Sequence, residues 1–292
     1  MNPEVSASYR LSEKVARERA RNFYYSFITL PAEKRRAFCA VYAFMRSCDD
    51  VADGPAADQA KRERLAKWHR DLDAAMAGDY VADPILPAFH DTVTRFSIPI
   101  RYFHLLIDGT EMDLTVRQYL TFDDLYRYCY HVASAVGLVS LQIFGYSDPR
   151  AVECAEHCGI AFQLTNILRD IKEDAELGRI YIPEEDLKRF GYDPEKLQRG
   201  VNDENFRSLM AFESARAEKY YERARKLIPM VDATSRPSLW AMMEIYNRIL
   251  RKIVRKRFAV FDGRVHLSAG EKTAIAIKAL AYRYISGGYG IH

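Results

Sequence analysis

Apolar residues recur at a helical period along almost the whole chain, and this feature restricts the possible folds most strongly. Long alternation of polar and apolar residues is absent, and no Asn-Gly or Asp-Gly turn joins two β-branched runs. The pattern therefore predicts an all-α fold. The expected helices are 11–29, 32–53, 58–77, 85–96, 100–114, 122–145, 149–175, 203–228, 235–261 and 269–285.

The longest stretch without a helical pattern is 176–202, and it does not look like a domain border. Its composition resembles that of the flanking segments, and the helical patterns on both sides need partners to bury their apolar faces. No repeat of fixed period is present, which disfavours a solenoid. We expect a single all-α domain over residues 1–292, a helical bundle around a central apolar cavity.

Composition and charge exclude several classes of protein. Apolar residues make up 49% of the chain and charged residues 28%, which is ordinary for a globular protein. The net charge is only +3, so a nucleic-acid partner is not expected. The chain has no apolar run of 18 residues and begins with charged residues throughout, so neither a membrane span nor a signal peptide is expected.

The cysteines indicate a reducing compartment, and we expect a cytoplasmic protein. Their number is odd, so a disulfide framework is not expected in so long a chain: Cys39, Cys48, Cys129, Cys154 and Cys158. Cys154, His157 and Cys158 lie within about one helical turn, but no second ligand pair follows them. Buried thiols are therefore preferred to a zinc site.

The segment 36–53 contains an apolar helix that ends in charge. Residues 37–45 are apolar or aromatic on every side, which indicates a buried helix. Tyr42, Arg46, Asp49 and Asp53 then lie within about 60° of one another on one face, with Asp50 beside them. The acids either emerge into solvent at the helix end or, if buried, need a cation to offset their repulsion.

A second polar stripe lies about 120 residues further along the chain. Gln163, Asn166, Asp170 and Asp174 are spaced by three or four residues, and Arg169 flanks them on an otherwise apolar helix. If the two stripes face each other across a cavity, they offer hard oxygen ligands suited to Mg²⁺, with Mn²⁺ as an alternative. Since Mg²⁺ usually keeps waters and binds substrate phosphate, a diphosphate is the expected ligand. No Walker loop points to a nucleotide.

Other residues indicate that this ligand carries an apolar chain. Small residues around Val132 and Gly137 would let such a chain approach the helix 122–145, although tight helix packing explains them equally well. Phe23 and Phe27 share a helix face and could form an aromatic wall that limits chain length, or could be ordinary core.

Four motifs resemble those of the squalene and phytoene synthases, which join two prenyl diphosphates head to head. They are RNFYYSF (21–27), YAFMRSCDDVAD (42–53), YCYHVASAVG (128–137) and QLTNILRDIKEDAELGRIYIP (163–183). The resemblance spans nearly the whole chain and implies an all-α isoprenoid synthase. Within the family, segment 132–146 looks most similar to bacterial hopanoid-pathway presqualene diphosphate synthases.

The resemblance assigns roles to particular residues. It implies metal ligands at Asp49, Asp50, Asp53, Asn166, Asp170 and Asp174. It implies a polar substrate pocket at Arg46, Gln163 and Arg169, cavity tyrosines at Tyr42, Tyr128 and Tyr246, and a late diphosphate-binding arginine at Arg264.

The reaction that it implies first is the condensation of two farnesyl diphosphates to presqualene diphosphate or a related C30 product. The alternative is a phytoene synthase that uses geranylgeranyl diphosphate, and a non-catalytic assembly factor is a third reading. NADPH would be needed only if a reductive second half-reaction follows.

The basic run 251–257 has two readings. Its cations are either a solvated helix face or a surface that contacts anionic lipid headgroups, which would make the protein peripheral at a membrane. Nothing in the sequence indicates the oligomeric state.

Overall fold

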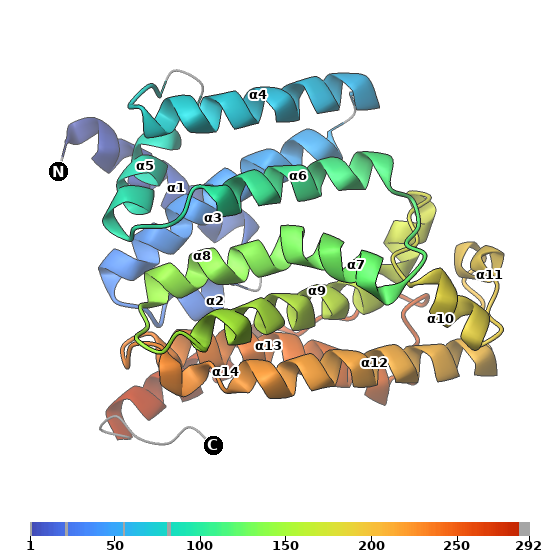
Figure 1. The fold of residues 1–292 in the computed structure, drawn as a ribbon. Helices are drawn as coiled ribbons and strands as arrows, with labels where there is room; N and C mark the ends of the chain where they lie inside the picture. The colour runs from blue at the N-terminus through green and yellow to red at the C-terminus, as the bar shows by residue number, and fades with distance from the viewer. Residues whose placement is uncertain (1, 21–22, 55, 81–82, 286–292) are drawn as a thin grey trace.

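The computed structural model describes residues 2–20, 23–54, 56–80 and 83–285, and throughout these ranges the chain is helical with no β-strand (Figure 1). Only two isolated β-bridges occur in these ranges, Gln118 with Ile180 and Tyr146 with Val231. The predicted all-α class is therefore confirmed. The first half contains α1 (Pro3–Arg19), α2 (Tyr24–Phe27), α3 (Ala32–Asp53), α4 (Asp58–Met76), α5 (Leu86–Arg95), α6 (Arg101–Thr115) and α7 (Phe122–Cys129).

The second half continues the bundle. It contains the π-helical turn η1 (Tyr130–Ser134), α8 (Ala135–Phe144), α9 (Ala151–Glu176), α10 (Glu184–Arg189), α11 (Pro194–Gln198), α12 (Glu204–Arg225), the 3₁₀ turn η2 (Ile228–Met230), α13 (Arg236–Arg255) and α14 (Ala269–Ile285).

The helices stack in layers, and α9 lies near the centre (Figure 1). It packs against α8, η1, α12 and α13, which explains why it is apolar on most of its circumference. Helix α3 is enclosed in the same way by α1, α4, α5, α6 and α8. Within that contact Phe44 stacks on Phe89 at 4.3 Å between ring centroids and meets Phe103 edge-on at 5.5 Å. Burial from several sides is what the apolar run 37–45 predicts.

Two predicted helices have the wrong limits. The expected helix 11–29 is in fact α1 and α2, since α1 begins at Pro3, where Asn2 caps the amide of Glu4, and ends before Ala20. The expected helix 235–261 ends at Arg255, because Arg257 and Phe258 adopt positive φ values of 49° and 59° and turn the chain. Neither residue is a glycine, so the sequence carries no stop signal there.

Two other segments also differ from expectation. The predicted helix 122–145 begins as expected, with a capping box between Thr121 and Asp124, but it is interrupted by η1. The stretch 176–202 is not irregular throughout, because it holds the short helices α10 and α11. The side chain of Asp193 caps α11 immediately before Pro194.

No helix in the described ranges is both long and apolar enough to cross a bilayer. The five cysteines are buried free thiols, as predicted. Burial raises the pKa of the Cys39 and Cys158 thiols to about 12, so these groups are unreactive core residues.

Candidate active site

Three helices bring their carboxyl-terminal ends, each bearing acids, to one end of the bundle. Asp49 lies in the last turns of α3, Asp113 near the end of α6, and Asp170 and Asp174 near the end of α9 (Figure 1). The C-terminus of a helix carries a partial negative charge. Three such ends together with these acids create a region that favours a cation.

Two adjoining chambers open between these helices, each of about 340 Å³. One is mainly apolar and is lined by α2, α3, α6, α8, α9 and α13; the other is polar and contains Asp49, Asp113, Asp170 and Asp174. The chambers share a set of wall residues: Asp49, Thr110, Asp113, Tyr128, Gln163 and Asn166. The whole site therefore suits a ligand with an apolar chain and an anionic head, provided that a cation lies between the head and the acids.

The first acidic motif, on α3, is open to solvent and only one of its described acids lines the chambers. Asp49 lies in the wall of both, and its carboxylate is 3.9 Å from the guanidinium of Arg46. Asp50 lines neither chamber; it accepts hydrogen bonds from Arg46 and, at 2.8 Å, from Arg19. The predicted ligand Asp53 ends α3, and its side chain lies outside the described residues.

The second acidic motif, on α9, is partly buried, and arginines hold its Asp170 in place. Asp170 accepts two hydrogen bonds from Arg169, at 2.7 and 2.5 Å, and two from Arg264, both at 2.8 Å. Burial alone would raise the pKa of Asp170, but the two guanidiniums lower it overall. Arg264 therefore reaches this motif from the loop between α13 and α14.

Asp174 lies in the same polar chamber, but its negative charge is less well balanced by nearby cations than that of Asp170. Burial, followed by the charge of Asp170, raises the pKa of Asp174 to about 7, and Asp113 acts in the same direction. A bound cation would relieve this repulsion.

The donor set is compatible with Mg²⁺ bridged by a phosphate. Asn166 donates to Gln163 at 3.2 Å, while the buried Oδ1 atom of Asn166 has no hydrogen-bond partner and is able to face a cation. In the described part of the chain no three acid, histidine or cysteine side chains converge as ligands of one ion. Oxygen donors of this kind suit Mg²⁺, which takes few protein ligands and completes its shell with water and phosphate.

The sequence analysis missed an acid and a tyrosine at the junction of the chambers. Tyr181 donates a hydrogen bond to Asp113 at 2.7 Å, and the hydroxyls of Tyr128 and Tyr181 are 3.5 Å apart. Asp113 ends an apolar helix, as the acids of α3 and α9 do, so the same pattern could have identified it. Tyr181 lies within the quoted motif 163–183 but outside the helical stripe.

An aromatic line forms one wall of the apolar chamber. Phe23 stacks on Phe27 with centroids 6.3 Å apart, Phe27 contacts Phe38 at 5.1 Å, and Phe38 contacts Phe144 at 4.9 Å. Phe27 is only 3% exposed. Phe23 and Phe27 thus line the chamber as predicted, and Phe38 and Phe144, which the sequence analysis did not single out, extend the wall.

Tyr246 is a partial exception among the predicted cavity tyrosines. Its ring stacks on Phe162 at 4.4 Å and contacts Phe23 at 5.3 Å, but Tyr246 is not in the chamber wall. Tyr42 and Tyr128 do line the apolar chamber. Burial raises the pKa of Tyr42 to about 12 and that of Tyr128 well above its usual value, so both remain neutral phenols.

The residues around Val132 of η1 and Gly137 of α8 line a chamber and also allow close helix packing. Val132 and Gly137 line the apolar chamber. Gly137 also permits close helix packing, because a Cβ atom there would lie 2.6 Å from the carbonyl oxygen of Ala155 on α9. Gly159 makes the reciprocal approach to Ala133.

Comparison with known proteins identifies similar sequences along most of the chain. The profile of the squalene/phytoene synthase family matches residues 16–271, which include both acidic motifs and all the chamber walls. A 15-cis-phytoene synthase from Synechocystis sp. is 39% identical over 280 residues, covering 92% of this chain and 83% of its own length. A phytoene synthase from Mycobacterium tuberculosis is 40% identical over 281 residues, covering 95% and 92%.

Two solved structures are similar in fold. A dehydrosqualene synthase crystallised with a ligand has a TM-score of 0.88 and 29% identity, covering 96% of this chain and 97% of that one. A squalene synthase from Alicyclobacillus acidocaldarius has a TM-score of 0.82 and 28% identity, covering 88% and 97%.

Proposed function

The chain belongs to the squalene/phytoene synthase family, and we propose that within this family of head-to-head prenyltransferases it acts as a phytoene synthase. Its substrate would be geranylgeranyl diphosphate, two molecules of which give a C40 product. The identity of 39–40% to two phytoene synthases, each matched over more than four fifths of its own length, carries this proposal. It replaces the farnesyl diphosphate reading, which rested on segment 132–146.

We assign the diphosphate end of the reaction to the polar chamber. Asp49, Asp170 and Asp174, with Asn166 and Asp53 of the same motifs, would hold Mg²⁺, which would act as a Lewis acid on the departing diphosphate. Mn²⁺ would serve the same donors. Arg264 and Arg169, already oriented by Asp170, would donate hydrogen bonds to phosphate oxygens, and Arg46 would do so from α3.

The apolar chamber would protect the allylic cation that forms when diphosphate leaves. Its mainly apolar walls would limit the access of water, which would otherwise capture the cation. The double bond of the second prenyl diphosphate would attack the cation, and loss of a proton to the released diphosphate would close a cyclopropane ring. Departure of the second diphosphate, rearrangement of the resulting cation and loss of a second proton would then give the C40 hydrocarbon without a reductant. Tyr42 and Tyr128 stay neutral, so they would offer their ring faces and hydroxyls to the cation without a reactive phenolate.

A C30 synthase is the second candidate, supported by the aromatic wall. Phe27 packs between Phe23 and Phe38, and a bulky wall in this chamber would shorten the chain that it accepts. A non-catalytic role is disfavoured, because a scaffold would not keep acids that repel one another.

Product analysis with farnesyl and geranylgeranyl diphosphate, each with Mg²⁺ and with or without NADPH, tests the proposal. A C40 hydrocarbon from geranylgeranyl diphosphate without NADPH is expected. Exclusive formation of C30 products would overturn it, and a Phe27→Ala variant that then accepts the longer substrate would locate the cause in the aromatic wall.

A further inference from the structure

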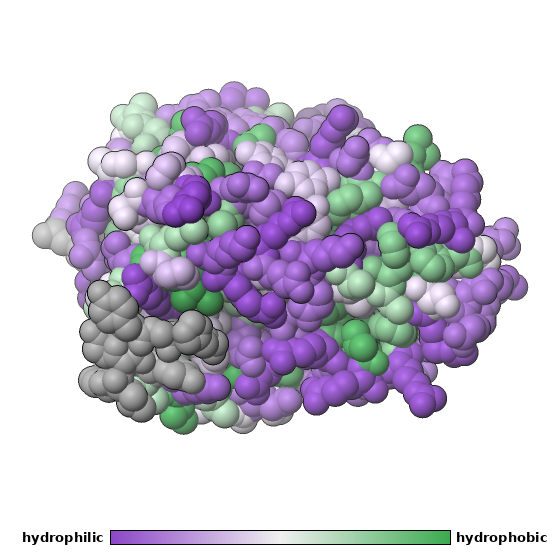
Figure 2. Space-filling model, turned by 60° about the horizontal axis from the view of Figure 1, so that its bottom comes forward, coloured by the Kyte–Doolittle hydropathy of each residue, from purple (hydrophilic) through white to green (hydrophobic). Residues whose placement is uncertain are grey.

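A groove of about 730 Å³ lies on the outer side of α12 and α13, away from both chambers. Helices α12, α13 and α14 lie on the side of the molecule that Figure 2 brings forward, where a hydrophobic strip on the right is bordered by hydrophilic side chains. The groove has apolar and small residues along its length: Ala211, Ala215, Leu250, Val254 and Phe258. Val254 is 44% exposed, which is unusual for a large apolar residue of this chain.

A buried polar atom in the groove lacks a partner. Ser214 of α12 lines the groove and is only 5% exposed, yet its Oγ atom makes no hydrogen bond. Because this oxygen is enclosed by protein atoms, a ligand in the groove would reach it only if the Ser214 side chain turned toward the groove.

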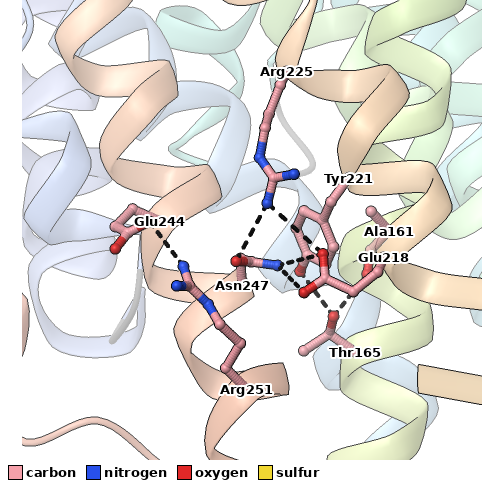
Figure 3. A network of polar contacts seen from close by, with 8 residues as sticks. All are labelled: Ala161, Thr165, Glu218, Tyr221, Arg225, Glu244, Asn247 and Arg251. Carbon is pink, nitrogen blue, oxygen red and sulfur yellow. Dashed lines mark hydrogen bonds and ion pairs between the residues drawn. The ribbon is translucent and has the colours of Figure 1, made fainter. Parts of the chain in front are cut away.

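The acids that line the groove already have hydrogen-bond or ion-pair partners, and Figure 3 shows those of Glu218 and Glu244. Glu218 accepts two hydrogen bonds from Asn247, at 2.9 and 3.0 Å, and lies 3.7 Å from Arg225. Glu244 pairs with Arg248 and Arg251. Glu271 accepts from the amide of Ser268 and lies 3.4 Å from Lys252.

Three cations at the end of α13 are left without such pairing. Arg255, Lys256 and Arg257 are exposed, and no acid of the described residues forms an ion pair with them. Arg255 lines the groove. The positive φ values of Arg257 and Phe258 bend the chain so that Phe258 is buried in the groove wall while the cations stay outside.

We propose that this groove and the three cations bind an anionic phospholipid at a membrane surface. The groove combines apolar residues with charged side chains that are mostly paired, and three cations without ion pairs lie at its end. This arrangement suits an anionic amphiphile, the acyl chain lying along the apolar residues of α13 and the headgroup meeting Arg255. A second copy of the chain would bring the same positive charge to the contact and be repelled. The inference rests in part on the proposed function, because its hydrocarbon product must enter a bilayer.

Vesicle co-sedimentation of the full chain tests whether the three cations at the end of α13 bind anionic lipid. Wild type should bind phosphatidylcholine–phosphatidylglycerol vesicles and bind phosphatidylcholine alone much more weakly. Each cation near an anionic surface contributes about fivefold to partitioning, so the triple variant Arg255→Gln, Lys256→Gln, Arg257→Gln should lose on the order of a hundredfold.

A matched control removes the same charge from the opposite side of the bundle. Lys61, Arg64 and Arg70 of α4 form no ion pair with an acid of the described residues. The triple variant Lys61→Gln, Arg64→Gln, Arg70→Gln should therefore bind vesicles almost as wild type does. An equal loss in both triple variants, or binding that ignores phosphatidylglycerol, would overturn the proposal.

A variant that fills the groove tests whether an acyl chain of the lipid lies in it. Ala215 is exposed, so Ala215→Trp should fold, occupy the groove and lower vesicle binding several-fold. Unchanged binding would contradict the groove as the lipid site. Activity on detergent-dispersed prenyl diphosphates should persist in all these variants, so loss of vesicle binding and failure of the proposed reaction are separately detectable.

Discussion

The acidic motifs of α3 and α9 look alike in sequence but differ in their surroundings. The side chains of Asp49 and Asp50 on α3 are 51% and 47% exposed, whereas that of Asp170 on α9 is 17% exposed. The α3 acids contact arginines at the surface, and Asp170 is clamped by Arg169 and Arg264. The side chains of the α9 motif are therefore held in place before a ligand binds, whereas those of the α3 motif are exposed to solvent and accessible to a ligand.

This difference suggests that the two motifs have different roles in binding the diphosphate. A buried, arginine-clamped carboxylate orients the positive charges that would receive the diphosphate. A half-exposed carboxylate at a helix end can bind a hydrated cation at little cost in desolvation. The two motifs should therefore respond differently to the loss of one negative charge.

Asp170→Asn should have the largest effect, since it removes the shared partner of two arginines. Arg169 is almost fully buried, and loss of one member of a buried ion pair costs about 3–5 kcal/mol in the free energy of unfolding. Turnover should be abolished as well. Thermal unfolding would measure the loss of stability, and single-turnover assays would measure the loss of activity. A variant with normal activity and stability would contradict the proposed role of Asp170 in holding Arg169 and Arg264.

Asp49→Asn should abolish most activity while leaving stability almost unchanged. Asp49 lines both chambers but is half exposed, so its loss should change the free energy of unfolding by less than about 1 kcal/mol. We expect kcat to fall on the order of a hundredfold. If this variant is as destabilised as Asp170→Asn, the contrast between the motifs is wrong.

Arg264→Gln should mainly weaken substrate binding. Its guanidinium is 51% exposed, so stability should change little, while KM for the prenyl diphosphate should rise about tenfold through loss of a charge-assisted hydrogen bond. Steady-state kinetics separate KM from kcat. A variant in which only kcat falls would argue against phosphate binding by Arg264.

Asp50→Asn should have the smallest effect, although sequence alone makes Asp50 the equal of Asp49. Because Asp50 faces Arg19 and Arg46 rather than the chambers, kcat/KM should fall less than about tenfold. A loss as large as that of Asp49→Asn would restore Asp50 as a metal ligand.

The sequence predicted the parts of the site that follow from helical spacing. Asn166, Asp170 and Asp174 all lie around the polar chamber because they share one face of a continuous helix. The separation of Asp49 from Asp50 was not predictable, since it depends on Arg19 of α1, which lies across a tertiary contact. Arg264 reaches Asp170 from a loop, and its position depends on packing rather than on a period.

The errors in the predicted helices also arise from tertiary contacts. The π-helical turn η1 lies where Gly109 of α6 packs against His131 and Val132, with no room for a Cβ atom. The end of α13 depends on positive φ values at Arg257 and Phe258. Arginine and phenylalanine are not typical turn residues, so the sequence does not predict a turn at this position. Tertiary contacts decide these details, and local propensity does not encode them.

Calorimetric titration of the protein with inorganic diphosphate, with Mg²⁺ or with EDTA, tests most directly whether the two motifs hold a diphosphate through a cation. Wild type should bind diphosphate tightly only with Mg²⁺, Asp49→Asn should lose most of the Mg²⁺-dependent gain, and Arg264→Gln should bind more weakly while keeping that dependence. Equal affinity of the wild type in Mg²⁺ and in EDTA would contradict the account.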